Sequence, residues 1–544
     1  MRMVTRSKVP VISLGVFMLL ALAGPLKAEA STAGLDEHLG RLLMVAFRGA
    51  EAPLERLQEL SPGGFIFFAG NVPSTETARR ITRELQSHTD RPLLFAVDQE
   101  GGPFSSYRPE DATLFPGNMA LGAADDEDLT RRVAEAVGRE LAYAGFNMNF
   151  APVVDVNTSP DNPIIGIRAF GAEPALVARH GQAFLAGLQA AGVAGVAKHF
   201  PGHGDTTVDS HLALPSVDGD FERLQAVELP PFQALIDAGV PAVMTAHVAF
   251  PAFEEGVPAT LSQPVLSGLL AEQMGFGGLV ITDYMDMAAI ADNYGAGEAA
   301  VKSIAAGADM VLLGPDFDMQ REVLAALKEA VATGRLPVER VEQALSRIEA
   351  VAATYRPAWH ASEPDRDGHG ALAVEAALKG ATLLWDDGVL PLARDQRVAV
   401  VAPRPSAFGE PPHLGAVLER HRDNVRAVVV SERPTPEERQ AALRAAEESD
   451  LIVVGSYYWL GGYPDELKEL VEGLLATGKS TVLVSLGNPD DLRHLSGRPA
   501  AYLAVYGYRE ANLEAAARVL VGTHRPQGSL PIPAGEFPLG SGER

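Results

Sequence analysis

The feature that most constrains the fold is a regular alternation of short β-rich runs with longer helical runs. The β-rich runs in the first part of the chain predict strands at residues 64–69, 93–98, 147–156, 193–199, 242–247, 279–283 and 310–313. Between them, helices are predicted at residues 75–86, 128–144, 174–191, 221–238 and 288–306. Repeated strand-then-helix units pair their strands in parallel. About seven such units within about 300 residues favour a (β/α)8 barrel of the TIM type over an open sheet.

The alternation resumes after a polar segment and predicts a second domain. Strands are expected at residues 398–401, 425–430, 451–455, 481–486 and 501–505, and helices at 437–448, 464–476 and 512–520. This pattern indicates an open parallel sheet with helices on both faces, an αβα sandwich. No phosphate-binding glycine motif follows its first strand, so we expect no nucleotide there. No cluster of its residues indicates chemistry, and we expect it to pack on the barrel and shape the cleft.

The segment between the two alternating regions is polar and interrupted by proline and glycine, which is typical of a linker. We therefore expect a catalytic barrel over residues 31–355, a linker over 356–372 and the αβα domain over 373–544. Two histidines of the segment, His360 and His369, are expected to be solvated. Two domains are also what the length of 544 residues suggests, because one hydrophobic core rarely serves so long a chain.

The N-terminus predicts secretion. Three basic residues among the first eight precede an apolar run over residues 9–23, and alanine, a small residue, stands at positions 28 and 30. This order is typical of a signal peptide, so we expect cleavage after Ala30 and a periplasmic or secreted protein. The alternative is an uncleaved anchor, but the run is short for a membrane span. No other segment is long and apolar enough, so we expect no integral span in the mature protein.

Composition excludes several partners and chemistries. The formal net charge of -25 argues against nucleic acid and against an anionic membrane surface, since both attract basic patches. The chain has no cysteine, which excludes disulfides and thiolate catalysis. We expect a monomer that needs no cofactor.

Polar side chains follow several of the predicted barrel strands. Asp98, His199, His247 and Asp283 each end a strand, and Lys198 precedes His199. The carboxyl ends of barrel strands meet on one face, so these side chains are expected to form one site. For a single residue, a buried charge with ordinary hydrogen bonds explains the position equally well, but the repetition over several strands favours an active site.

The loop over residues 198–211, Lys-His-Phe-Pro-Gly-His-Gly-Asp-Thr-Thr-Val-Asp-Ser-His, concentrates such groups. The metal ligands that it offers are His199, His203, Asp205, Asp209 and His211. However, no pair has the helical His-x-x-x-His spacing, and Pro201 with two glycines prevents a helix here. We therefore expect no metal and favour proton transfer.

Asp209 and His211 are separated by one small residue, so in an extended or turned loop their side chains lie on one side and can hydrogen-bond. A carboxylate on one imidazole nitrogen keeps the ring basic, and the other nitrogen can protonate a leaving oxygen and later deprotonate water. Asp283 would lie opposite. Asp286 is its rival but is expected to be a helix N-terminal residue. A carboxylate opposite a proton donor suits glycoside cleavage, although the spacing alone also allows other acid–base chemistry.

Residues 198–211 resemble the Lys-His-Phe-Pro-Gly-His-Gly…Asp-x-His signature of the β-N-acetylglucosaminidase branch of glycoside hydrolase family 3. Other barrel segments resemble the same family, at residues 98–102, 115–122, 150–156 and 162–168. The resemblance covers the whole barrel and extends more weakly to residues 525–531. Three positions depart from the family pattern: Pro103 replaces Arg, Ala169 replaces Ser, and Tyr284 replaces Asp or Ala.

The resemblance implies a retaining hydrolase that works in two steps. Asp283 would attack the anomeric carbon, and His211, paired with Asp209, would serve as acid and then as base. The hydroxyls of the non-reducing sugar would be held by Asp98, Arg168, Lys198 and His199.

The leading hypothesis is therefore a secreted exo-β-N-acetylglucosaminidase that removes terminal N-acetylglucosamine from peptidoglycan fragments or chitin-type oligosaccharides. A family 3 β-glucosidase or another β-glycosidase stays open, as does a phosphorolytic variant in which phosphate replaces water. The alternative from another class is a non-catalytic glycan-binding protein of the cell wall. This alternative predicts that Asp283 or His211 is replaced by another residue, and both are present.

Overall fold

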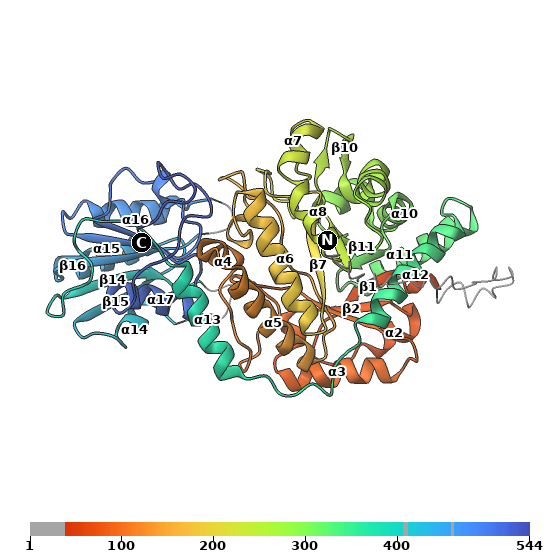
Figure 1. Ribbon diagram of the computed structural model, residues 1–544, viewed down its shortest axis with the longest axis horizontal. Coiled ribbons are helices and arrows are strands. Elements are labelled where there is room, and N and C mark those ends of the chain that lie inside the picture. Colours follow the sequence, from red (N-terminus) through yellow and green to blue (C-terminus); the bar gives the residue numbers. More distant parts are fainter. Residues whose placement is uncertain (1–37, 406–411, 459–461, 544) are drawn as a thin grey trace, which may run out of the picture.

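The computed structural model describes residues 38–405, 412–458 and 462–543, and the predicted signal peptide lies outside them. The described chain forms two lobes side by side (Figure 1). The larger lobe, coloured red to green, holds the first alternating region, and the smaller blue lobe holds the second. No described helix is long and apolar enough to cross a bilayer.

Within these residues, eight parallel strands close into a barrel in the order β1-β12-β11-β8-β7-β6-β3-β2. The strands are β1 (Leu43–Ala46), β2 (Gly64–Phe67), β3 (Leu94–Val97), β6 (Met148–Asn149), β7 (Ala194–Phe200), β8 (Ala242–Thr245), β11 (Leu279–Tyr284) and β12 (Met310–Leu313). The predicted barrel is thus confirmed. Sequence analysis does not predict β1, because this apolar run of four residues follows a helical turn closely and shows no boundary signal.

Helices cover the outside of the barrel. They are α2 (Leu54–Leu60), α3 (Thr75–Ser87), α4 (Asn118–Ala124), α5 (Glu127–Ala144), α6 (Pro174–Ala190), α7 (Phe221–Ala226), α8 (Leu229–Asp237), the π-helical η4 (Pro264–Gln273), α9 (Ala288–Tyr294), α10 (Ala296–Ala306), α11 (Phe317–Ala332) and α12 (Val338–Thr354). Local chemistry sets several starts: the side chains of Ser74 and Asp126 cap α3 and α5, and Pro174 opens α6.

Two of the predicted helices are each divided in the structure. The prediction of one helix over residues 221–238 is wrong, because α8 begins anew with Pro230 and Pro231 in its first turn, where neither proline removes a helical hydrogen bond. Likewise, Gly295 with a φ of 71° separates α9 from α10, since that backbone conformation ends a helix.

The described residues of the second lobe form a six-stranded sheet in the order β13-β18-β17-β16-β14-β15. Its strands are β13 (Thr382–Asp386), β14 (Val398–Pro403), β15 (Val425–Val430), β16 (Leu451–Ser456), β17 (Thr481–Ser485) and β18 (Ala501–Ala504), and its helices are α14 (Leu414–Leu418), α15 (Pro436–Glu447), α16 (Asp465–Leu475) and α17 (Glu510–Leu520). The predicted αβα sandwich is confirmed, with one correction. β13 pairs antiparallel with β18, so the sheet has an antiparallel edge strand and is not wholly parallel.

The polar segment between the lobes is partly helical. Helix α13 (Arg366–Gly380) begins inside the segment that was expected to be a linker, and it packs against α4, α5 and α17. The prediction that His369 is solvated is wrong. Its side chain is buried, and its Nδ1 lies 2.7 Å from Oε1 of Glu140 on α5. A partner 229 residues away in sequence decides this burial, which local composition cannot reveal.

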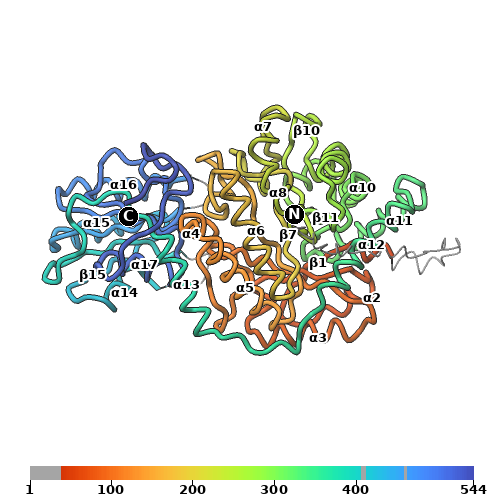
Figure 2. Tube along the Cα trace, viewed as in Figure 1, coloured from red at the N-terminus to blue at the C-terminus, as the bar shows by residue number. Residues whose placement is uncertain are grey.

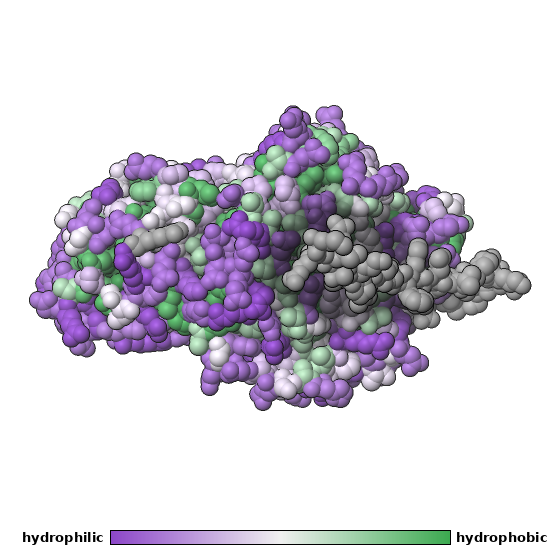
Figure 3. Space-filling view, viewed as in Figure 1, coloured by the Kyte–Doolittle hydropathy of each residue, from purple (hydrophilic) through white to green (hydrophobic). Residues whose placement is uncertain are grey.

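Two arginines of the second lobe also bind the barrel. Arg509 donates from Nε to the carbonyl oxygen of Gly102 over 2.7 Å, and Arg493 lies 2.6 Å from the carboxylate of Asp161. In Figure 2, α13 runs between the two lobes. Figure 3 shows a largely hydrophilic face on both lobes, with hydrophobic residues in small separate patches. Through Arg509 and Arg493, the second lobe contacts loops that surround the carboxyl ends of the barrel strands.

Candidate active site

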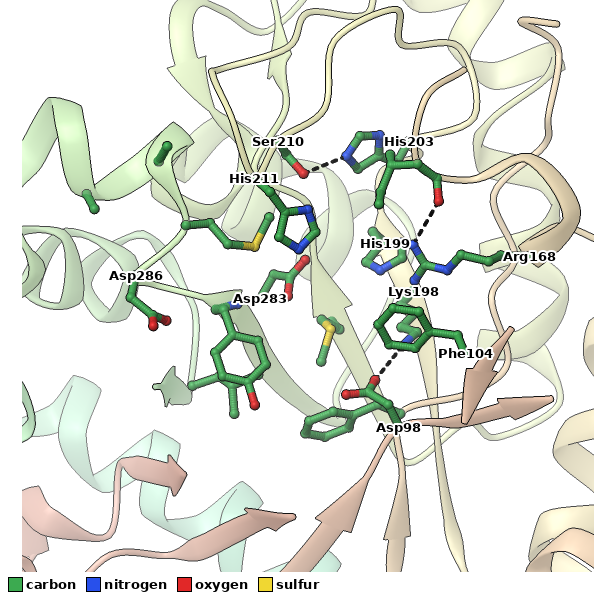
Figure 4. A pocket seen from close by; sticks show the side chains of 18 of the residues that line it. Asp98, Phe104, Arg168, Lys198, His199, His203, Ser210, His211, Asp283 and Asp286 are labelled. Atoms are coloured by element: carbon green, nitrogen blue, oxygen red, sulfur yellow. Dashed lines mark hydrogen bonds and ion pairs between the residues drawn. The ribbon is translucent and has the colours of Figure 1, made fainter. Parts of the chain in front are cut away.

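The strongest candidate site is a cavity of about 540 Å³ at the carboxyl ends of the barrel strands. Figure 4 shows side chains that converge on it from strand ends and loops. Of the site residues predicted from sequence, those that line the cavity are Asp98, Arg168, Lys198, His199, His211 and Asp283. Asp209 does not line it but hydrogen-bonds to His211, which does.

A buried cluster of charges forms one side of the cavity. The ammonium of Lys198 lies 2.7 Å from Oδ1 of Asp98 and 2.7 Å from Oε1 of Glu100. The guanidinium of Arg168 donates to both oxygens of Glu100, over 2.9 and 2.8 Å. Each of these side chains is less than a tenth exposed, so each charge depends on its protein partners for the stabilisation that water would otherwise supply.

This pairing sets the protonation of the two carboxyl groups. Burial raises the pKa of Glu100, but attraction to Arg168 and Lys198 outweighs burial and brings the pKa to about 2. Burial also raises the pKa of Asp98, and here Lys198 does not cancel the effect, because Glu100 opposes ionisation. Glu100 is therefore an ionised anchor for both cations. Sequence analysis does not single it out, although it stands in one of the segments that resemble family 3.

Asp155, another residue that sequence analysis misses, holds two histidines. Its Oδ2 lies 2.7 Å from Nδ1 of His199, and its Oδ1 accepts from the backbone N–H of His203 over 2.7 Å. Burial raises the pKa of Asp155, but attraction to His199 lowers it more, so the carboxylate is ionised. The bond at Nδ1 fixes the ring of His199 against the cavity and leaves Nε2 as its second nitrogen for a ligand.

The predicted pair of Asp209 and His211 forms at the mouth of the cavity. Oδ1 of Asp209 accepts from the backbone N–H of His211 over 2.9 Å and lies 2.8 Å from its Nδ1. This hydrogen bond raises the pKa of His211, although partial burial opposes it. The His211 side chain is 53% exposed, so it can contact the leaving group of a substrate that enters from solvent. In Figure 4 it lies above Asp283.

A neutral histidine anchors this loop. Nε2 of His203 lies 3.0 Å from Oγ of Ser210, the residue between the members of the pair, and its Nδ1 lies 2.9 Å from Oγ1 of Thr206. Burial and the neighbouring His199 lower the pKa of His203 to about 4. His203 is therefore a fixed support for Ser210. His203 is one of the possible metal ligands that the sequence of this loop offers.

Asp283 ends β11 and faces the cavity. Burial raises its pKa, but His199 and His247 attract the charge and the backbone N–H of Tyr284 donates to Oδ1 over 2.8 Å, so the pKa is lowered overall. His247 does not line the cavity. Its Nδ1 lies 2.7 Å from Oγ1 of Thr260, and its Nε2 lies 2.8 Å from the carbonyl oxygen of Tyr284. It supports the backbone beside Asp283.

Asp286 lies beyond the end of β11, as expected, but it is not part of a helix. Helix α9 starts at Ala288 and its cap position is Met287, which places Asp286 before the cap. Its carboxylate packs closely against the backbone of Gly314. A Cβ atom on residue 314 would lie only 2.1 Å from Oδ2 of Asp286. Asp286 lines the cavity, and burial raises its pKa.

The other polar groups of the 198–211 loop are engaged with protein. Asp205 lies 2.8 Å from the guanidinium of Arg223 and accepts from Thr158 over 3.0 Å. In the part of the chain that the structure describes, no group of three or more His, Cys, Asp or Glu side chains is arranged to hold a metal ion.

Comparison with known proteins identifies the family. Residues 34–351 match the glycosyl hydrolase family 3 N terminal domain, and residues 381–536 match the glycosyl hydrolase family 3 C-terminal domain. The chain belongs to glycoside hydrolase family 3. This family 3 hydrolase is similar to β-hexosaminidase A of Pseudoalteromonas piscicida, with 32% identity over 88% of this chain and 90% of that protein.

Two further relatives are informative. The β-N-acetylglucosaminidase/β-glucosidase of Cellulomonas fimi is 33% identical over 70% of this family 3 hydrolase and 70% of its own length. The solved structure of a family 3 β-N-acetylglucosaminidase from Paenibacillus sp. str. FPU-7 superposes with a TM-score of 0.88 at 37% identity. It covers 92% of this chain and 99% of that one. The family resemblance seen in the sequence, and the glycoside hydrolase activity that it implies, are confirmed.

Proposed function

We propose that this protein is a retaining exo-β-N-acetylglucosaminidase. The observation that carries the proposal is that Asp283 and His211 line one cavity together with the buried cluster of Asp98, Arg168 and Lys198. An ionised carboxylate, an exposed proton donor and a set of fixed polar groups are the parts that glycoside cleavage requires. Relatives with the names β-hexosaminidase and β-N-acetylglucosaminidase support the sugar preference.

The buried cluster would bind the terminal sugar. Lys198, Arg168 and His199 can donate to sugar hydroxyls, and Asp98 can accept from them. Glu100 and Asp155 already hold Arg168, Lys198 and His199 in place. These side chains therefore lose little conformational entropy when a sugar binds.

In the first step, Asp283 would attack the anomeric carbon while His211 donates the proton on Nε2 to the departing glycosidic oxygen. The C–O bond to the leaving group breaks as the C–O bond to Asp283 forms. In the second step, neutral His211 takes a proton from water, whose oxygen attacks the same carbon and releases Asp283 as a carboxylate. The hydrogen bond of Asp209 stabilises the imidazolium form before the first proton transfer.

Two further features belong to the proposal. The N-terminal signal peptide would carry the protein out of the cytoplasm. Outside the cytoplasm, peptidoglycan fragments and chitin-type oligosaccharides both present terminal N-acetylglucosamine. The protein would act as a monomer on these small glycans without a cofactor.

The test compares nitrophenyl β-N-acetylglucosaminide with nitrophenyl β-glucoside for the wild type and for Asp283→Ala. We expect turnover of the first substrate and its loss in the variant, with an unchanged circular dichroism spectrum. Glu419→Gln is the control, because it alters an exposed carboxylate of the second domain that does not line the cavity, and it should retain turnover. NMR of the first product should show the β-anomer.

Activity on the glucoside alone would keep the mechanism but overturn the sugar. That outcome has some support, since the C. fimi relative carries both names. Turnover of neither sugar would favour a glycan-binding protein, and a first product of the α-anomer would refute retention.

A further inference from the structure

The cavity has two unlike sides. In Figure 4, Asp98, Phe104, Arg168 and Lys198 lie on one side of Asp283, and Asp286 lies on the other. We call this other side the outer part. The name covers the cavity-lining residues of the segment that contains Asp286, from the end of β11 through α9, and Pro315, which follows the Gly314 that Asp286 contacts. The residues of that segment are Tyr284, Asp286, Met287, Ala288, Ala291 and Asp292. If the buried cluster binds the terminal sugar, as proposed above, the outer part receives the leaving group.

The outer part carries negative charge. Asp286 and Asp292 both line it, and no lysine or arginine does so among the described residues. On the opposite side, the two cations are already balanced by Asp98 and Glu100 at 2.7 to 2.9 Å, so they have little charge left to attract an anion. A carboxylate on the leaving group would therefore be repelled by two like charges, and salt should screen this repulsion because both side chains are exposed.

Cations near the outer part are held by other groups. Arg56 donates to the carbonyl oxygen of Pro315 over 2.9 Å and to the side chain of Gln320, and it lies over the ring of Phe317 at 4.5 Å. Arg48, which is exposed, lies close enough to influence Arg56 but does not line the cavity. Neither arginine faces Asp286 from within the cavity lining.

The uncharged groups of the outer part suit a sugar. The hydroxyl of Tyr284 is buried and has no hydrogen-bond partner among the residues that the structure describes. Its ring lies 5.7 Å from that of Phe68, which also lines the cavity. A pyranose suits these rings, since its C–H faces can pack on aromatic side chains.

We infer that the outer part selects an uncharged or amino-sugar leaving group and disfavours one that bears a carboxylate. This inference rests on the proposed function. It favours chitin-type oligosaccharides over peptidoglycan fragments, because the muramic acid of peptidoglycan carries either a free lactyl carboxylate or, where that group is amide-linked, a peptide with carboxylates of its own. Asp286 and Asp292 are the specificity-determining residues.

The experiment uses two disaccharides that differ in one charge. These are N-acetylglucosaminyl-β-1,4-N-acetylmuramic acid and its lactyl methyl ester, which keeps the bulk of the lactyl group. Chitobiose serves as the reference substrate. We expect kcat/KM to be about tenfold higher for the ester than for the acid. Raising the salt concentration to about 1 M, where the Debye length is about 3 Å, should reduce this ratio in the unmodified protein.

The variants assign the selection to the two carboxylates. In Asp286→Asn with Asp292→Asn, the ester-to-acid ratio should fall towards one. Asp292→Asn alone, at an exposed position that carries little risk to folding, should lower it in part. Glu419→Gln is the matched control, because it removes an exposed carboxylate at the end of α14 in the second domain and should leave the ratio unchanged.

Equal rates on acid and ester in the wild type would overturn the inference and leave the proposed function standing, provided that chitobiose is cleaved. A ratio that persists in the double variant would show that other groups select against the acid. If no N-acetylglucosaminide is cleaved, the proposed function falls, and the inference falls with it.

Discussion

Both domains gather polar side chains at the carboxyl ends of parallel strands, but they balance the charges differently. In the barrel, each buried carboxylate of the cluster has a cation within 2.9 Å, and for Glu100 the attraction outweighs burial. In the second domain, two adjacent carboxyl groups, Asp490 and Asp491, follow β17, and Tyr458 follows β16. These side chains of the second domain are buried with far less attraction from neighbouring cations.

Asp491 shows the difference most clearly. Its carboxyl lies beside the hydroxyls of Ser456 and Ser485, but these bond at good geometry to Tyr463 and to the carbonyl oxygen of Asn488. Within the described chain, neither oxygen of Asp491 has a partner of good geometry. Burial therefore raises the pKa of Asp491 well above the usual range.

Its neighbour Asp490 is an intermediate case. Burial raises the pKa of Asp490 to about 6, although Arg493 lies beside it and opposes the rise. Position at the end of a parallel strand therefore does not make a carboxylate reactive. The cations around it decide whether it is an ion ready for catalysis or a neutral acid.

The largest expected effect contrasts one histidine from each domain. His211→Ala should lower turnover of chitobiose by about 10²–10⁴-fold, because its leaving oxygen needs a proton, and should affect the nitrophenyl substrate much less. His494→Ala should leave both rates within about twofold, because His494 stacks on Tyr463 at 4.9 Å and burial lowers its pKa. The kinetics of both variants on both substrates check this. Equal losses on both substrates in His211→Ala would contradict the acid role.

Removing the carboxylate at the centre of the barrel cluster should destabilise the protein next most. Glu100→Gln leaves Arg168 and Lys198 buried with less compensation, at a cost of about 3 kcal/mol in the free energy of unfolding. Urea titration measures this. The wild type should lose this stabilisation as the pH falls from 4.5 towards 2, where Glu100 takes up a proton, and the variant should lack that part of the pH dependence. A loss below about 1 kcal/mol would mean that the cluster is no stronger than a surface pair.

The pH dependence of catalysis isolates the pair at the cavity mouth. Asp209 raises the pKa of His211 above 6.5, so activity should be lost only as the pH rises through this higher value. Asp209→Asn should move the alkaline limb of kcat/KM to lower pH. The acidic limb, which Asp283 controls in the proposed mechanism, should stay in place. An unmoved alkaline limb would assign that limb to another group.

The smallest effect is expected for Asp491→Asn in the second domain. Burial raises the pKa of Asp491 in the folded protein, so wild-type stability should fall as the pH rises from 3.8 towards this raised pKa. An amide needs no proton, and the variant should change the free energy of unfolding at pH 7 by less than about 1 kcal/mol. Urea titration of Asp491→Asn beside Glu100→Gln checks the contrast. Similar losses in both would remove the distinction drawn between the two domains.

Much of the fold follows from local sequence patterns. Seven of the eight barrel strands and five of the six strands of the second sheet are predicted, because apolar runs and helix caps are short-range signals. The missed elements depend on distant partners. The strand β1 gains its place from pairing with β12 and β2, and the antiparallel β13 from pairing with β18. Helix α13 looks like a linker until its packing against α4, α5 and α17 is known.

The candidate site divides in the same way. Local sequence predicts the pair of Asp209 and His211, whose hydrogen bond spans two residues, and the positions of Asp98, Lys198 and Asp283 at strand ends. Which of these charges are balanced depends on contacts between distant segments. Glu100 meets Arg168 across 68 residues, and Asp155 meets His199 across 44. Protonation depends on burial and on charges a few ångströms away, and these neighbours come together only when the barrel closes.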